Sequence, residues 1–306
     1  MVTIQHKLHL TMVDGKVVSA LSGMPTSNCT VCGAKPSELN DIVAARSRPV
    51  RTDGYEYGMS TLHAWIRIFE CVLHLSYKLE VRKWQARSAE DKKAVQAKKA
   101  EIQRRFRDEM GLVVDMPKAG GSGTTNDGNT ARRAFRDVNK LSQVTGVDRY
   151  LLNKFSIILS ALASTTAEID EVKYGEFTME TAQLYNERYY WYCMPPTLHK
   201  LLAHGQAIIS TLEMPVGMYS EEAQEARNKN TRDYRQHHAR KTSRLETMTD
   251  QMHYLLVTSN PVISEIIRSD ITRARRQLKP REAAGDYVDI SPLLMSSGTE
   301  AGDEDA

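Results

Sequence analysis

The motifs Cys29-Thr-Val-Cys32 and His199-Lys-Leu-Leu-Ala-His204 decide how this chain must fold. Two thiolates and two imidazoles suit a tetrahedral zinc ion, and both spacings lie in the range of zinc-binding motifs. Because the two pairs are far apart in the sequence, a shared ion would join the beginning of the chain to its last third. A structural zinc contributes on the order of 10–16 kcal/mol to the folding of small domains. We therefore expect everything between the pairs to fold as one body.

The alternative interpretation is two unrelated pairs, which the spacing alone leaves open. On an ideal helix, residues five apart lie about 140° apart around the axis. If His199 and His204 bind one ion, we therefore expect the helix that carries them to bend or to end there.

Composition excludes several classes of protein. The 306 residues suffice for one large domain or two small ones. No stretch reaches the length of a membrane span, and the N-terminus has no signal-peptide pattern. Four cysteines in a chain of this size are not a disulfide scaffold, so a reducing compartment and a metal are favoured. We expect no membrane and no small-molecule substrate.

Basic residues are concentrated in two stretches, although the net charge is only +3. These stretches are residues 78–107 and 227–244, and such concentration is typical of a polyanion-binding protein. The alternative is that both are solvated helix faces.

The hydrophobic pattern predicts a mainly α-helical protein with a small β element at its N-terminus. Alternation predicts a strand over residues 6–13, a turn at Asp14-Gly15 and a short return strand over 16–21. Helices are expected over residues 36–46, 60–77, 90–110, 130–145, 148–165, 175–192, 195–212, 220–244, 248–258 and 261–276. Ser220 is expected to cap the helix that it begins. The glycine-rich loop 111–128 lacks a Gly-Lys-Ser/Thr ending and is not a P-loop.

Two acidic residues have positions that suit metal binding. Asp14 follows the first predicted strand, and Glu225 lies near the start of the helix that begins at Ser220. A run of cations follows this glutamate: Arg227, Lys229, Arg232, Arg235, Arg240 and Lys241. An acid that leads into such a run makes sense if it holds a divalent cation while the basic residues hold phosphates.

These features resemble a known family, the V(D)J recombinase and its Transib-type transposon relatives, in the C-terminal part of their catalytic core. Four matching stretches occur in the family's order and cover about residues 7–261. They are Asp14 with Cys29-Thr-Val-Cys32, the run Asn126-Asp-Gly-Asn-Thr-Ala-Arg-Arg133, His199 to His204, and Ser220 to Lys229 with its basic continuation. The resemblance implies part of an RNase H-like fold with a large helical insertion and a zinc site.

The resemblance also implies roles for individual residues. Asp14 and Glu225 match the second and third of three carboxylates that hold two Mg²⁺ or Mn²⁺ ions for strand cleavage and transfer. The zinc ligands are matched by Cys29, Cys32, His199 and His204. DNA contacts are expected from Asn129, Arg132, Arg133, Lys229, Arg232, Arg235, Arg240 and Lys241. For the pair Arg132 and Arg133, the alternative is an ordinary helix start.

The same resemblance predicts the domain organisation. A core-like domain is expected over residues 1–278, with a β and zinc-knuckle part (1–60), a helical insertion that includes the histidine helix (61–215), and the Glu225 helix with its C-terminal neighbours (216–278). Residues 279–306 are expected to be a disordered acidic tail.

One departure from the family changes the functional expectation. The family's first carboxylate lies on an earlier strand, and residues 1–13 contain neither Asp nor Glu. We therefore expect a nuclear, DNA-binding remnant or domesticated derivative of a DDE transposase, with little or no strand cleavage by itself. A homodimer is the family's working form. The alternatives are an active two-metal endonuclease completed by another chain, or a zinc-stapled protein-interaction module.

Overall fold

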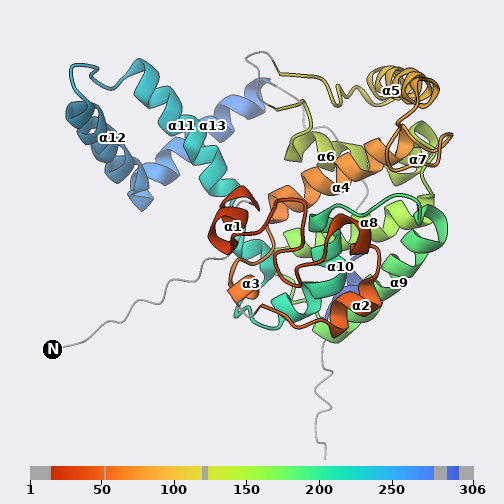
Figure 1. Cartoon of the computed structure of the whole chain (residues 1–306). Coiled ribbons are helices and arrows are strands. Elements are labelled where there is room, and N and C mark those ends of the chain that lie inside the picture. Colours follow the sequence, from red (N-terminus) through yellow and green to blue (C-terminus); the bar gives the residue numbers. More distant parts are fainter. Residues whose placement is uncertain (1–14, 52, 119–122, 279–287, 296–306) are drawn as a thin grey trace, which may run out of the picture. The chain divides into compact units, whose positions relative to one another are not determined.

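The described part of the chain is built from α-helices. The computed structural model describes residues 15–51, 53–118, 123–278 and 288–295, and these are mainly helical (Figure 1). The β pairing among them consists of two isolated bridges, Pro117 with Thr124 and Ile169 with Leu294. The predicted mainly-α class is therefore confirmed. Within these residues, no helix has both the length and the apolarity that crossing a bilayer demands.

The chain divides into two compact units, which are described separately. The first comprises Met1–Ser220 with Val288–Ala306, and the second comprises Glu221–Tyr287. Residues 1–60 and 61–215, predicted as separate parts, belong to the same unit. In chain order the first unit contains α1 (Gly15–Ser22), the 3-10 helix η1 (Pro36–Glu38), α2 (Ile42–Ser47), α3 (Asp53–Glu56), α4 (Thr61–Ser76), α5 (Ala89–Met110), α6 (Gly128–Phe135), α7 (Val138–Thr145), α8 (Arg149–Ala163), α9 (Glu171–Tyr189), α10 (Pro196–Ile209), η2 (Val216–Tyr219) and η3 (Ser291–Leu293).

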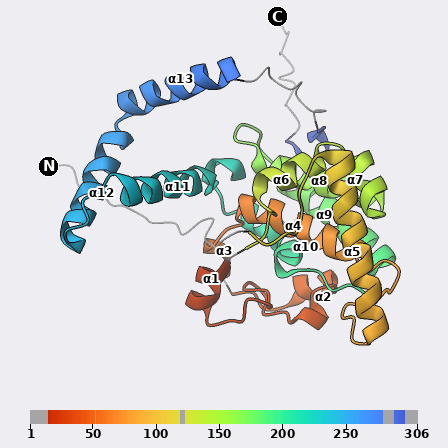
Figure 2. The same ribbon diagram turned by 90° about the horizontal axis from the view of Figure 1, so that it is seen from above.

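Helix α4 is the centre of the first unit. The Ser60 side chain caps it by accepting from the His63 N–H. Its buried face packs against α5, α6, α7, α8 and α10 (Figures 1 and 2). Edge-to-face aromatic pairs join it to two neighbours, Phe69 with Phe106 of α5 and Trp65 with Phe135 of α6. The core therefore surrounds α4 on most of its circumference.

Helices α9 and α10 lie against each other, and the C-terminal segment of the unit packs on α9. The backbone N–H of Asp170 donates to Leu293 O, and Leu293 is fully buried. The prediction of a disordered tail over 279–306 is therefore wrong for residues 288–295, because this segment buries two apolar side chains, Ile290 and Leu293, in the core. The other residues of that range lie outside the described part.

The predicted return strand over residues 16–21, at the N-terminus, is wrong. Residues 16–21 lie in helix α1, which buries Val18 and leaves Val17 exposed. The helix ends at Ser22, whose carbonyl accepts from Arg51 Nη1, and Gly23 follows with φ +69°. A glycine in this left-handed conformation is a common helix terminator. The predicted strand 6–13 and its turn residue Asp14 lie outside the described residues.

Two predicted helices are each divided in two by a capping residue. The range 36–46 becomes η1 and α2, because the Asp41 side chain accepts from the Ala44 N–H and starts a new helix. The range 130–145 becomes α6 and α7, because Asp137 caps the second helix by accepting from the Lys140 N–H. Short helices with their own caps therefore replace the long helices expected from periodicity.

The second unit contains α11 (Glu222–His237), α12 (Arg244–Ser259) and α13 (Pro261–Leu278). The N-cap of α11 is Glu221, not the predicted Ser220. Ser220 closes η2 instead, and its hydroxyl accepts from Thr61 Oγ1. Helix α11 also ends at His237, before the predicted end near Arg244, because Ser243 caps α12 by accepting from the Glu246 N–H.

Candidate metal centre and nucleic-acid interface

The four predicted zinc ligands meet in the first unit. One ligand atom from each of Cys29, Cys32, His199 and His204 lies within 4.8 Å of the others. The Cys32 Sγ is 3.4 Å from His199 Nε2, and sulfur and nitrogen on a tetrahedral zinc are about 3.6 Å apart. Cys29 and both histidines are buried, whereas Cys32 is partly exposed. The cluster could hold a metal ion such as zinc.

The hydrogen bond of His199 fixes which of its nitrogens can bind a metal. Its Nδ1 is 2.6 Å from the Leu39 carbonyl oxygen, which can only accept. Nδ1 therefore donates its proton, and Nε2 keeps a lone pair directed at Cys32. A ligating histidine usually has such a partner on its second nitrogen, which holds the ring in place.

His204 supplies an independent test of whether the cluster fits a metal. Its Nε2 is buried and has no hydrogen-bond partner, which is costly for a buried polar atom. An ion bound by the neighbouring sulfurs would satisfy this nitrogen. The His199 and His204 rings lie edge to face with centroids 5.5 Å apart. Both imidazoles therefore lie beside the two sulfurs, where they could bind the same ion.

The two thiols are electrostatically unequal. The Cys29 side chain hydrogen bonds to Cys32, which lowers the pKa of the Cys32 thiol well below its usual value. The same hydrogen bond, together with burial, raises the pKa of Cys29. The hydrogen bond therefore favours the thiolate form of Cys32, the form that binds metals, and the Cys29 thiol loses its proton when a metal binds.

The local fold of the Cys29–Cys32 segment follows from its sequence. The Gly33 N–H donates to Cys29 O at 2.8 Å, and the Cys29 N–H donates to Ala34 O at 2.9 Å. Gly33 has φ +72°, which the absence of a Cβ permits at low cost. This tight turn places both thiols on the same side of the chain.

Helix α10 differs from our expectation for the histidine helix. It runs from Pro196 to Ile209 and contains both His199 and His204, so of the two expectations, a bend or an end of the helix, the end is wrong. The two side chains converge across the helix because their rings tilt toward each other. The Pro195-Pro196 pair sets the start of the helix.

Asn40 fastens the cysteine segment to the chain that leads into α10. Its Nδ2 donates to Tyr192 O at 3.0 Å and to Tyr190 O at 3.3 Å, and its Oδ1 accepts from Met194 N at 2.7 Å. Arg46 of α2 adds a second attachment by donating to Leu202 O in α10. These contacts hold the two ligand pairs together without a metal.

We expect Asn40→Ala to destabilise the first unit by about 2–3 kcal/mol, because three hydrogen bonds are lost and Met194 N–H is left without its acceptor. Thermal unfolding measures the effect. In Asn40→Asp the carboxylate still accepts from Met194 but faces the two carbonyls, so we expect a similar loss. A change below about 0.5 kcal/mol in both variants would contradict this role.

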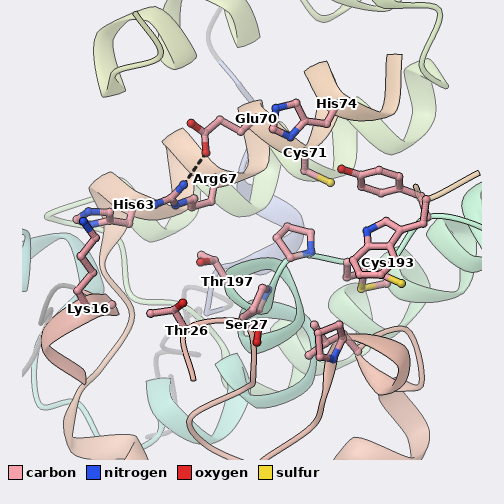
Figure 3. Close-up of a pocket in the computed structure, with 18 residues that line it drawn as sticks. Lys16, Thr26, Ser27, His63, Arg67, Glu70, Cys71, His74, Cys193 and Thr197 are labelled. Atoms are coloured by element: carbon pink, nitrogen blue, oxygen red, sulfur yellow. Dashed lines mark hydrogen bonds and ion pairs between the residues drawn. The ribbon is translucent and has the colours of Figure 1, made fainter. Parts of the chain in front are cut away.

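A groove of about 510 Å³ lies between α4 and the chain segments beside the metal cluster (Figure 3). His63, Arg67, Glu70 and His74 of α4 line one side, while Thr26, Ser27 and Thr197 line the other (Figure 3). The carboxylate of Glu70 is paired with Arg67 at 2.8 Å. Sequence analysis missed these residues, although their spacing of four, three and four residues marks one polar face of the α4 helix.

The predicted DNA-contacting residues of α6 have different surroundings. Asn129 and Arg133 are exposed, one helical turn apart. Arg132 is partly buried, and its guanidinium lies 5.4 Å from the centre of the Trp65 ring. Arg133 therefore presents its charge to solvent, whereas Arg132 packs against the core.

The cations of α11 and the following loop remain available to a partner. Lys229, Arg232, Arg235 and Lys241 are exposed and form no ion pair with any described residue. Four cations, Arg232, Arg235, Lys241 and Arg244, line one hollow in this unit. Arg240 is different, because its guanidinium is 2.8 Å from Asp250 and lowers the pKa of that carboxyl group to about 2.

The charge of the basic helix α5 is partly neutralised by neighbouring acids. Some of its cations are paired with acids, as in Lys98 with Glu101 and Arg104 with Asp108, whereas Lys92, Lys93 and Arg107 are exposed and form no ion pair with any described residue. Both basic stretches therefore keep unneutralised charge, and in the second stretch four cations surround one hollow. For the paired cations of α5, the solvated-face interpretation fits the contacts.

Of the two predicted catalytic carboxylates, the structure describes Glu225. Glu225 is exposed in the first turn of α11, and Asp14 lies outside the described residues. Across the part of the chain that is described, the Cys29, Cys32, His199 and His204 group is the cluster of potential metal ligands.

Fold and site thus define a helical protein with a Cys2His2 cluster that joins distant parts of its sequence. No protein-family model matches the chain, and no curated protein is significantly similar to it.

Proposed function

We propose that this protein is a zinc-stabilised, nuclear DNA-binding protein related to the catalytic cores of the V(D)J recombinase and Transib-type transposases. The metal is proposed as Zn²⁺ because two sulfur and two imidazole ligands favour zinc over Mg²⁺ or Ca²⁺. The proposed kinship, with its RNase H-like fold, rests on the order of the motifs. Its support is that two motifs separated by more than half of the chain meet in one cluster.

The observation that carries the proposed DNA binding is the unpaired charge of α11 and its continuation. Phosphate contacts need cations that are exposed and not already neutralised by protein carboxylates. Arg232, Arg235, Lys241 and Arg244 satisfy both conditions and surround one hollow. A polyanion backbone is the chemistry that such a group of cations would recognise.

Salt dependence is the test of this proposal. If about six phosphates are contacted, the logarithm of the affinity for duplex DNA falls with the logarithm of salt concentration with a slope of roughly −5. We expect the triple variant Lys229→Gln, Arg232→Gln, Arg235→Gln to reduce the slope to about −2 or −3, because each contact contributes about 0.9. Fluorescence anisotropy with a labelled duplex measures both quantities.

A matched control uses three cations of the first unit that are already paired with acids. Lys83→Gln, Lys98→Gln and Arg104→Gln remove the same charge as the test variant, and we expect the wild-type slope. A slope near zero for the wild-type protein would contradict DNA binding and favour the protein-interaction module.

A further inference from the structure

A cavity of about 120 Å³ in the first unit adjoins the groove that α4 lines. The two spaces share Gly15, Thr26, His63, Pro196 and Thr197 among their lining residues. One buried water needs only about 10–15 Å³, so the cavity has room for a larger polar group. The cavity and the groove together offer adjoining space for a ligand.

The lining of the cavity is rich in hydrogen-bonding groups. Five hydroxyl groups and one amide belong to its described lining residues, Ser19, Thr26, Thr30, Ser60, Thr197 and Asn28. Two basic side chains, His63 and Lys200, also line it, and none of the described lining residues is an aspartate or a glutamate. A lining with many donors and no carboxylate suits an anion that has several acceptor oxygens.

Lys200 of α10 places a buried ammonium group at this cavity. Burial lowers the pKa of the group to about 8, and the group forms no hydrogen bond or ion pair with any described residue. The thiol of Cys29 acts on it through its charge, but that sulfur belongs to the metal cluster. An ammonium group without a partner is costly to bury. An anion in the cavity would supply the partner that the described residues do not.

Helix α10 also begins at the cavity, and its first N–H groups have no side-chain cap. Its N-cap Pro195 and first residue Pro196 carry no N–H, so the groups without a partner inside the helix are those of Thr197 and Leu198. By contrast, a Ser or Asp side chain caps each of the helices from α4 to α9. An oxyanion at this position would complete the cap and lie at the positive end of the helix dipole.

The ammonium group and the start of α10 lie at the same place. Lys200 follows Thr197 by three residues, so the two side chains are neighbours on one face of the helix, and both line the cavity. Figure 3 shows Thr197 beside Thr26 and Ser27, on the side of the groove opposite α4. Backbone N–H groups, hydroxyl groups and one cation around a single space are the donors that recognise a phosphate group.

The adjoining groove indicates what the phosphate is attached to. Trp84, which is 40% exposed, lines the groove together with Met194 and Pro195. An exposed aromatic ring among apolar side chains suits a planar or apolar group. A phosphate monoester leaves the cavity by one bond, and the groove provides that path. A diester would need a second path for its other bond, so the arrangement favours a monoester.

We propose that the cavity at the start of α10 binds the phosphate group of a phosphate monoester, whose ester part lies in the groove with Trp84. The inference rests on the lining of the first unit and not on the DNA binding proposed for α11. Isothermal titration calorimetry of the full-length protein at constant ionic strength tests it, with adenosine monophosphate as the probe. We expect inorganic phosphate to bind about tenfold more weakly, because it lacks the ester part, and adenosine about tenfold more weakly or worse, because it lacks the phosphate.

Two variants test the residues that carry the inference. Lys200→Met should weaken the binding of adenosine monophosphate about tenfold or more, and Thr197→Val, which keeps the charge, about threefold or more. Lys200→Met should not lower the unfolding temperature of the ligand-free protein, because it removes a buried charge that has no partner among the described residues. The matched control is Lys154→Met, because Lys154 is buried but pairs with Glu180 and does not line the cavity. We expect the wild-type affinity for this control.

Three results would overturn the proposal. The first is a wild-type protein that binds neither adenosine monophosphate nor inorganic phosphate. The second is a Lys200→Met variant that binds adenosine monophosphate unchanged, or that loses it only together with its zinc while Thr197→Val binds normally, which would assign the lysine to the metal cluster. The third concerns the source of the phosphate. The dinucleotide adenylyl-adenosine, whose phosphate is a diester, should bind about tenfold more weakly than the monophosphate, and equal binding would show that the cavity takes a nucleic-acid backbone instead.

Discussion

Chelation of the metal is expected to destabilise the whole first unit, not only the segment around the cysteines. The Cys29–Cys32 turn and helix α10 are joined at the cluster, and α10 packs against α2, α3, α4 and α9. Even a loss of about 4 kcal/mol, well below the 10–16 kcal/mol of small zinc domains, should lower the unfolding temperature by roughly 8–16 °C in a unit of this size. Differential scanning calorimetry with and without chelator measures the shift.

Single ligand variants make this expectation specific to the cluster. Cys29→Ser and His204→Ala should unfold at temperatures close to that of the chelated protein, and chelator should change them little further. Cys193→Ser is the matched control, because Cys193 is partly buried but lies outside the cluster. Equal effects of Cys29→Ser and Cys193→Ser, with no response of the wild type to chelator, would show that the cysteines stabilise by packing alone.

Gly217→Ala is expected to destabilise the first unit by about 3 kcal/mol, at the upper end of the cost of overpacking. A Cβ at this position would lie 2.4 Å from Ser164 O and 2.6 Å from Ala163 O, both backbone atoms at the end of α8. The Gly217 N–H also donates to Ser164 O, so the two segments cannot separate without losing that bond. Chemical denaturation followed by circular dichroism measures the difference.

Gly15→Ala is the control for this substitution. No atom lies within 4 Å of a Cβ built at Gly15, and its φ is not in the left-handed region. Because alanine favours helix, we expect a change of about 0.5 kcal/mol or less, or a small stabilisation. If Gly15→Ala and Gly217→Ala changed the free energy of unfolding equally, the close approach of residue 217 to α8 would not be the reason for a glycine there.

The helical class and the main elements were predictable because their signals are local. Ser60 before the apolar stripe of α4 and Gly111 after α5 are ordinary start and stop residues, and the structure uses them as caps. The same reasoning could have found more boundaries. Ser243-Arg-Leu-Glu246 has the spacing of a capping box, and Ser243 does begin α12. The helical pattern of residues 220–244 continues past this cap, so periodicity alone predicts an α11 longer than the one that ends at His237.

Features that depend on distant contacts were not predictable from local patterns. Residues 16–21 contain two adjacent valines, which favour a strand, but α1 buries only one of them and Arg51 binds its last carbonyl. Residues 288–295 have little helical or strand pattern, yet η3 packs on α9. In both cases the partner lies far away in the sequence, so no local window contains the information.

The metal cluster was predictable from the sequence only in part. The residue types and spacings of Cys29-Thr-Val-Cys32 and His199 to His204 predicted a shared ion, because few other arrangements need two thiols and two imidazoles together. Nothing in the sequence indicated the supporting contacts, which are the carbonyl of Leu39 on His199 and the side chain of Asn40. Those atoms become neighbours only after the chain has folded.

Metal analysis of the full-length protein, purified without chelator, tests the central claim most directly. We predict one zinc ion per chain in the wild-type protein and in Cys193→Ser, and well under one in Cys29→Ser and His204→Ala. A wild-type protein that contains no zinc and takes up none when it is added, while Cys29 and Cys32 stay reduced, would contradict the claim that these four residues form a metal centre joining distant parts of the chain.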